Sequence, residues 1–161
     1  MTENDKAAKK IKITDPKLGL EKATSWCAYQ ERCQQEVRDK LYEWGLWPDA
    51  VENIISELIT QNFLNEERFA KAYAGGKFRI KKWGRVKIKL ELKKRKISDY
   101  CIKKGLKEIE EDDYRFTLMK VITEYSKKVK EKHPLKRKYR IVNYALSRGF
   151  EQDLIWEALG N

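Results

Sequence analysis

An apolar pattern that recurs three times along the chain restricts the fold more than any other feature of the sequence. Its first copy comprises Val37, Leu41, Gly45-Leu46, Val51 and Ile55. It returns 51 residues later as Ile88, Leu92, Lys96-Ile97, Ile102 and Leu106, and after a further 53 residues as Ile141, Ala145, Gly149-Phe150, Ile155 and Leu159. Each copy predicts a helix, a short turn and a second helix, because its apolar residues recur at helical spacing.

A further segment with helical spacing precedes each copy, so we predict an all-α chain of three tandem three-helix units. The units are expected at 21–63, 64–109 and 110–161, after a basic, loosely ordered N-terminal tail at 1–20. One unit is too small to hide its own apolar face, and the three are therefore predicted to stack into an elongated, curved helical repeat array. The tail has two interpretations, a basic arm for a partner and a solvated terminus.

The segment 86–93, VKIKLELK, is the place where the local pattern and the repeat disagree. Apolar and polar residues alternate strictly here, which by itself predicts a half-buried strand. The same position reads as helix in the other two copies, so we predict a helix in the middle copy as well. On that helix Ile88 and Leu92 share one side while Val86 and Leu90 lie nearly opposite, and we expect neighbouring units to cover both sides.

Positive charge is concentrated in the middle of the chain. The net charge is +11, and residues 77–107 contain fourteen Lys or Arg against two acids, Glu91 and Asp99. Such a concentration favours a polyanionic partner, either nucleic acid or an acidic protein surface. A solvated basic face is the alternative.

Four of these cations are spaced to form one stripe on the predicted helix: Arg85, Lys89, Lys93 and Lys96. Like charges four residues apart destabilise a helix by roughly 0.2–0.5 kcal/mol per pair, so we interpret the unbroken stripe as a binding surface. The basic region extends further through Arg79, Lys81 and Lys82, and a second patch comprises Lys136, Arg137 and Arg140.

Trp83 lies inside this basic region and has two interpretations. An exposed indole stacks on a nucleic-acid base or anchors a protein interface. Alternatively, the indole fills the junction between two helices, as a Trp at the end of an element often does.

The sequence offers little from which to build a catalytic or metal centre. Cys27, Cys33 and Cys101 lack CxxC spacing, and His133 is the only histidine. The acidic run at 110–113 is better explained by the positive end of a helix dipole than by a metal. We therefore expect a protein that is not an enzyme and that binds no cofactor or metal.

Hydropathy argues against a membrane protein. No stretch approaches the roughly 20 consecutive apolar residues that a membrane helix needs, and no signal peptide is recognisable. We expect a cytoplasmic monomer.

The strings NFLNEERFAKAY and KFRIKKWGRVKIKLELKKRKI resemble the signature of the RecX regulators, over roughly residues 24 to 159. An acidic turn before Phe-Ala is followed by a basic stretch, a glycine and a Leu-x-x-basic-x-Ile ending. Lys96 departs from the family pattern, which has Gly there, as at Gly45 and Gly149 of this chain. The resemblance implies a bacterial protein that binds the RecA filament along its groove and inhibits strand exchange, ATP hydrolysis and co-protease activity, without chemistry of its own.

Two functions therefore stand side by side. The first is a regulator of the RecA nucleoprotein filament that touches protein and also DNA phosphates. The second is a stand-alone protein that binds single- or double-stranded DNA without sequence preference, through the same basic surface. A nuclease would need convergent carboxylates and a divalent metal, which the pattern lacks.

Overall fold

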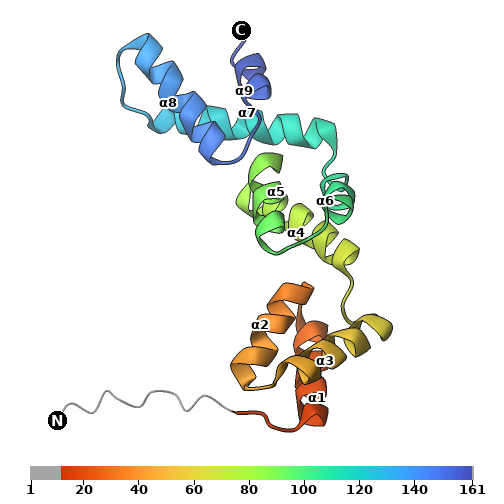
Figure 1. Cartoon of the computed structure of the whole chain (residues 1–161). Helices are drawn as coiled ribbons and strands as arrows, with labels where there is room; N and C mark the ends of the chain where they lie inside the picture. Colours follow the sequence, from red (N-terminus) through yellow and green to blue (C-terminus); the bar gives the residue numbers. More distant parts are fainter. Residues whose placement is uncertain (1–11, 161) are drawn as a thin grey trace, which may run out of the picture. The chain divides into compact units, whose positions relative to one another are not determined.

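The computed structural model describes residues 12–160, and this part of the chain contains nine α-helices and no strand. In order, they are α1 (Pro16–Tyr29), α2 (Gln34–Trp44), α3 (Pro48–Thr60), α4 (Glu66–Lys81), α5 (Arg85–Lys94), α6 (Asp99–Leu106), α7 (Glu111–Lys128), α8 (Pro134–Ser147) and α9 (Gln152–Ala158) (Figure 1). The predicted all-α tandem helical repeat is confirmed. The segment that alternates like a strand forms α5, so the repeat was a better guide than the local pattern.

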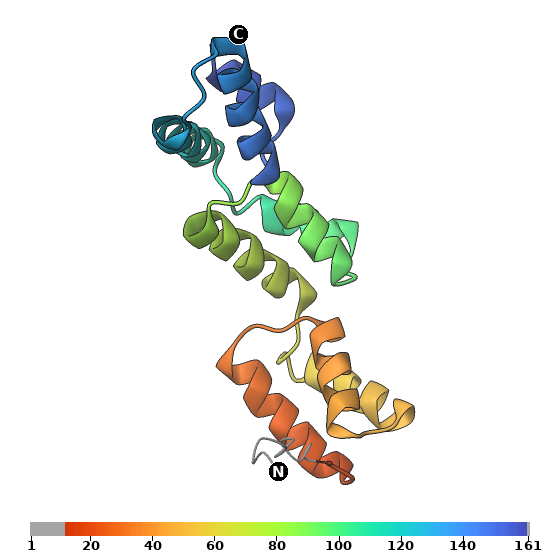
Figure 2. The ribbon, with the colours of Figure 1, turned by 90° about the vertical axis from the view of Figure 1, so that its left-hand side faces the viewer.

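The chain divides into two compact units, the first ending at Glu66. In the first unit α1, α2 and α3 pack against one another, as both views of the ribbon show (Figure 1 and Figure 2). Their apolar faces form a core that includes Val37, Leu41, Val51 and Leu58, all fully buried. Three of these four residues belong to the repeated apolar pattern or its continuation along α3.

The first helix begins earlier than the sequence predicts. The tail was expected to reach residue 20, but α1 starts at Pro16, where proline lacks only an N–H that would be unpaired anyway. Asp15 caps the helix by accepting a hydrogen bond from the Lys17 N–H at 3.0 Å. Ile13 is buried, and its N–H donates to the Trp44 carbonyl at 2.7 Å. Residues 1–11 of the predicted tail lie outside the described part.

The second unit runs from Glu67 and contains the helices of the middle and third repeats. In the middle repeat, Gly105 of α6 lies so close to α4 that an added Cβ would come within 2.6 Å of the Ala70 carbonyl oxygen. Between the repeats, the N–H groups of Gly84 and Val86 donate to the carbonyls of Arg148 and Gly149 at 2.8 and 2.9 Å. The start of α5 is thus hydrogen-bonded directly to the turn that follows α8.

The three turns between the second and third helices of the repeats share one geometry. Gly45, Lys96 and Gly149 occupy equivalent positions and all have positive φ, at 103°, 59° and 95°. In each turn the next residue's N–H donates back to a carbonyl five residues earlier, at 3.1, 3.2 and 3.2 Å. This is the Schellman arrangement that ends many helices. Lys96, which departs from the family pattern, nevertheless adopts the backbone conformation that favours glycine.

Several apolar side chains are more exposed than their spacing predicts. Val86 and Leu90 are each 54% exposed, so the second apolar side of α5 is not covered within the described chain. The expectation that neighbouring units bury both sides was wrong, whereas Ile88 and Leu92 are fully buried as predicted. Ile80, expected to face inward with Phe69, is also exposed because α4 is near its end there.

We expect Lys96→Gly to raise the free energy of unfolding by about 1 kcal/mol. An L side chain in the left-handed region costs about 1–2 kcal/mol, and glycine avoids this strain but loses more chain entropy on folding. The measurement is urea unfolding followed by circular dichroism. Lys94→Gly removes the same charge inside α5 and should instead destabilise the protein by about 1 kcal/mol. Destabilisation by Lys96→Gly would contradict the interpretation.

Candidate partner-binding surface

The exposed cations on α5 are the centre of the candidate surface. Lys89 and Lys93 lie four residues apart, are both exposed, and take part in no ion pair within residues 12–160. Glu91, between them in sequence, pairs instead with Lys94 at 3.1 Å and with Arg95 at 3.4 Å. The hydrogen bond from Lys94 lowers the pKa of Glu91 and keeps it ionised. Lys89 and Lys93 therefore present uncompensated charge, and we call them the α5 lysine pair.

The predicted stripe is shorter than the sequence indicates, because Arg85 has a structural role. Its guanidinium donates to Glu111 at 2.9 Å and to Glu151 at 2.6 Å, and it lies 3.9 Å from the centre of the Tyr114 ring. The Tyr114 hydroxyl accepts the Arg85 backbone N–H at 3.0 Å and also hydrogen-bonds Glu151. Arg85 thus joins the start of α5 to the third repeat and is not a free cation of the stripe.

The other predicted cations of the middle repeat lie in different settings. Lys96 is exposed but follows α5 instead of continuing its stripe. Lys82 pairs with Glu124 at 3.7 Å. Arg79 and Lys81 are exposed in the last turn of α4, where their charge complements the negative end of the helix dipole.

The second predicted patch is largely engaged with its own repeat. The Arg137 guanidinium donates to the Val129 carbonyl at 3.0 Å and to the Ser126 carbonyl, so it satisfies the C-terminal end of α7. Arg140 pairs with Glu131 at 3.3 Å. Of the three predicted residues, Lys136 is the one whose side chain is exposed without an ion pair in the described chain.

Trp83 is half-buried, with two ammonium groups over its ring. Lys77 lies 5.0 Å and Lys87 4.4 Å from the ring centre. Such cation–π contacts contribute roughly 0.5–1 kcal/mol each at partly exposed sites. Sequence reasoning did not single out Lys87, although its position four residues after Trp83 gave the signal.

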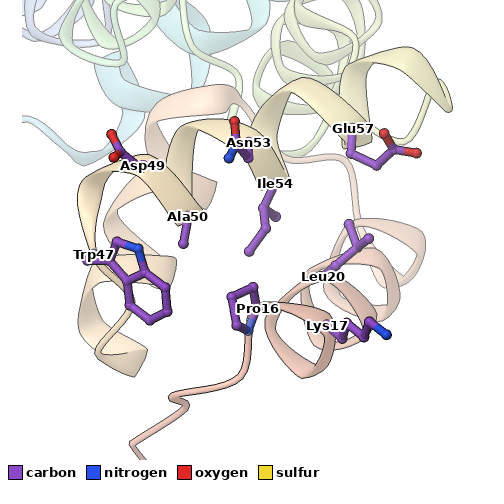
Figure 3. A pocket seen from close by; sticks show the side chains of 9 residues that line it. All are labelled: Pro16, Lys17, Leu20, Trp47, Asp49, Ala50, Asn53, Ile54 and Glu57. Carbon is purple, nitrogen blue, oxygen red and sulfur yellow. The ribbon is translucent and has the colours of Figure 1, made fainter.

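A shallow apolar groove of about 320 Å³ lies in the first unit, between α1 and α3. Figure 3 shows Pro16, Leu20, Ala50 and Ile54 facing one another across it, with Trp47 at one end. Among residues 12–160, no three His, Cys, Asp or Glu side chains lie together in a way that could hold a metal. The described helices include none that combines the length and apolarity needed to cross a bilayer. Cys27, Cys33 and Cys101 are free thiols.

Comparison with known proteins assigns the chain to a family. Models of the first, second and third three-helix domains of RecX match residues 20–58, 65–106 and 117–159. The chain belongs to the RecX family. The three matched ranges contain the three copies of the apolar pattern, and the α5 lysine pair lies in the second domain.

Individual relatives are consistent with this assignment. The regulatory protein RecX of Clostridium perfringens is 31% identical over 126 residues, covering 76% of this chain and 58% of the relative. That of Lactobacillus johnsonii is 27% identical over 135 residues, 84% of this chain and 50% of the relative. The chain thus spans little more than half the length of these relatives. The crystal structure of RecX from Lactobacillus salivarius has the same fold, with a TM-score of 0.79, 23% identity, and coverage of 89% of this chain and 94% of that one.

We expect Tyr114→Phe to lower the free energy of unfolding by about 1–3 kcal/mol. The substitution keeps the buried ring against Phe78 and Phe150 but leaves the Arg85 N–H and a Glu151 oxygen without the hydroxyl. Urea unfolding gives the difference. Tyr139→Phe removes a hydroxyl from a half-exposed ring and should change stability by less than about 0.5 kcal/mol. Equal effects of the two substitutions would rule out a special role for the Tyr114 hydroxyl.

The Arg85 contacts also predict acid sensitivity. The hydrogen bond from Arg85 lowers the pKa of Glu111 below its ordinary value of 4.5. Stabilisation by Glu111 is then complete above pH 4.5 and is lost as the pH falls through the lowered pKa. Glu111→Gln should therefore lower the melting temperature at pH 7 but not at the acid end of a titration from pH 7 to pH 3. A melting-temperature difference that stays constant over this range would contradict the assignment.

Proposed function

We propose that this protein is a non-catalytic regulator that binds RecA nucleoprotein filaments and inhibits their recombinase, ATPase and co-protease activities. Membership of the RecX family supports regulation in general. The observation that carries the choice of surface is the α5 lysine pair, which keeps its charge uncompensated although Glu91 lies between the two lysines in sequence. The protein acts in the cytoplasm as a monomer.

The energetic argument concerns what the lysines cost the isolated helix. Lys89 and Lys93 repel each other across one turn, which destabilises α5 by roughly 0.2–0.5 kcal/mol. Glu91 relieves neither of them because it points to Lys94 and Arg95. An anionic surface, such as an acidic groove of a protein filament or the phosphates of its DNA, turns this repulsion into attraction. Val86 and Leu90, exposed on the same helix, supply apolar area for a protein partner.

Charge reversal of the lysine pair tests the proposal. We expect Lys89→Glu with Lys93→Glu to abolish inhibition of RecA ATP hydrolysis and strand exchange, while the melting temperature stays near that of the wild type, because both side chains are exposed. Lys103→Glu with Lys107→Glu makes the same charge change at the same spacing elsewhere in the middle repeat and should retain inhibition. Full inhibition by the α5 variant would disprove the assignment of the surface.

Salt dependence separates the proposal from stand-alone DNA binding. Binding through phosphates alone weakens with a log–log slope of about −0.7 to −0.9 per phosphate, whether or not RecA is present. We expect tighter binding to a RecA–DNA filament than to bare single-stranded DNA at physiological salt. Equal affinity for the two would favour a sequence-nonspecific DNA-binding protein instead.

A further inference from the structure

A polar cavity in the second unit has a composition that the α5 surface does not explain. It has a volume of about 340 Å³ and lies where the end of α4 meets α7 and α8. This volume is at the lower end of the range for ligand pockets, about 300–1,000 Å³. Its charged lining residues are Lys81, Lys82, Glu124, Lys128 and Arg148. Four cations thus face one carboxylate around a single hollow.

The one acid is already neutralised. Glu124 pairs with Lys82 at 3.7 Å, which leaves Lys81, Lys128 and Arg148 as the excess charge. Lys81 and Lys128 are exposed and make no ion pair within residues 12–160. Three positive charges around one cavity repel one another unless an anion is bound between them.

Arg148 has more donors than the surrounding protein accepts. One terminal nitrogen of its guanidinium donates to the Lys81 carbonyl, which fixes the group at the cavity wall. Its Nε is buried and has no hydrogen-bond partner in the described chain. A buried guanidinium N–H without an acceptor is costly, since hydrogen bonds of charged groups are worth roughly 1.5–3 kcal/mol. Polyanionic oxygens are the acceptors that a guanidinium fork fits best.

Two tyrosines complete the wall. The rings of Tyr125 and Tyr144 are stacked, with centres 4.0 Å apart and planes 7° from parallel. Both residues line the cavity, and a tyrosine hydroxyl can donate to a phosphate oxygen. Because the rings hold each other in place, these donors are preorganised.

Helix dipoles give a simpler reason for some of these cations, but not for the cavity. Lys81 ends α4 and Lys128 ends α7, so each meets the negative end of a helix. The same effect accounts equally for Lys127, in the last turn of α7, which does not line the cavity. It does not account for an Arg148 donor without an acceptor or for the paired tyrosines.

We propose that this cavity is a phosphate-binding site, formed by Lys81, Lys128, Arg148 and the tyrosine pair. The phosphate comes from a nucleic-acid strand or from a free nucleotide. The site is separate from the α5 lysine pair and goes beyond filament regulation, so a test without RecA leaves the proposed function untouched if it fails.

Nuclear magnetic resonance with inorganic phosphate tests the site directly. We expect the Arg148 Nε–H resonance and the amides around Tyr144 to shift on titration with millimolar phosphate and not with chloride at matched ionic strength. In Lys81→Gln with Lys128→Gln, which keeps the Lys81 carbonyl and the Arg148 contact, the phosphate affinity should fall at least fivefold. Absence of shifts at the cavity in the wild type would overturn the proposal.

A matched variant separates the cavity from the overall charge. Lys127→Gln with Lys130→Gln removes the same charge from neighbouring exposed positions outside the cavity. For a short oligothymidylate, the cavity variant should bind at least tenfold more weakly than the wild type, with a log–log salt slope smaller by about 0.7, and the matched variant within twofold. Equal losses in the two variants would overturn the proposal.

The source of the phosphate follows from two further ligands. Thymidine monophosphate that binds the cavity as tightly as the oligothymidylate indicates a nucleotide site, whereas a much tighter oligothymidylate indicates a strand. Both outcomes support a phosphate site. Thymidine without phosphate should not shift the Arg148 resonance, and binding of thymidine as tight as that of its monophosphate would contradict phosphate recognition.

Discussion

The close approach of two backbone segments, at Gly84 and Gly149, determines how the middle and third repeats are joined. A Cβ on Gly84 would lie 2.2 Å from the Gly149 carbonyl oxygen, and one on Gly149 would lie 2.3 Å from the Cβ of Lys87. The two hydrogen bonds from Gly84 and Val86 are possible because neither glycine has a side chain. Arg85, held between these donors, is thereby brought to Glu111 and Glu151, so the ion-pair network depends on the glycine contact.

This junction changes the meaning of the charge on α5. Arg85 and the lysine pair look equivalent in sequence because they share one helical face. In the structure Arg85 is shared between two carboxylates and a tyrosine ring, while Lys89 and Lys93 remain exposed. The basic surface available to a partner is therefore smaller and more sharply placed than the net charge of +11 suggests. A buried, paired guanidinium stabilises an interface between repeats, and an exposed ammonium is left to attract a partner.

The repeat made much of the fold predictable. Helical spacing recurred at equivalent positions, so α5 could be recognised although its own residues alternate as in a strand. The turn positions were also recognisable, since Gly45 and Gly149 mark two of them, and the repeat locates the third at Lys96. The start of α1 was missed because Asp15 and Pro16 were read as breakers within a tail, although the same two residues form a helix cap. The predicted burial of Val86 and Leu90 failed because spacing shows that a face is apolar, not that another element covers it.

The candidate sites show the same division. The amino-acid sequence by itself determined the helices, the repeat and the location of positive charge, because these depend on residue spacing within one segment. The tertiary structure decided which cations are free, through partners far away in sequence such as Glu151 for Arg85 and Glu124 for Lys82. It also decided that Lys81, Lys128 and Arg148 surround one cavity. No local pattern encodes these groupings, since an ion pair or a cavity forms only where packing brings separate helices together.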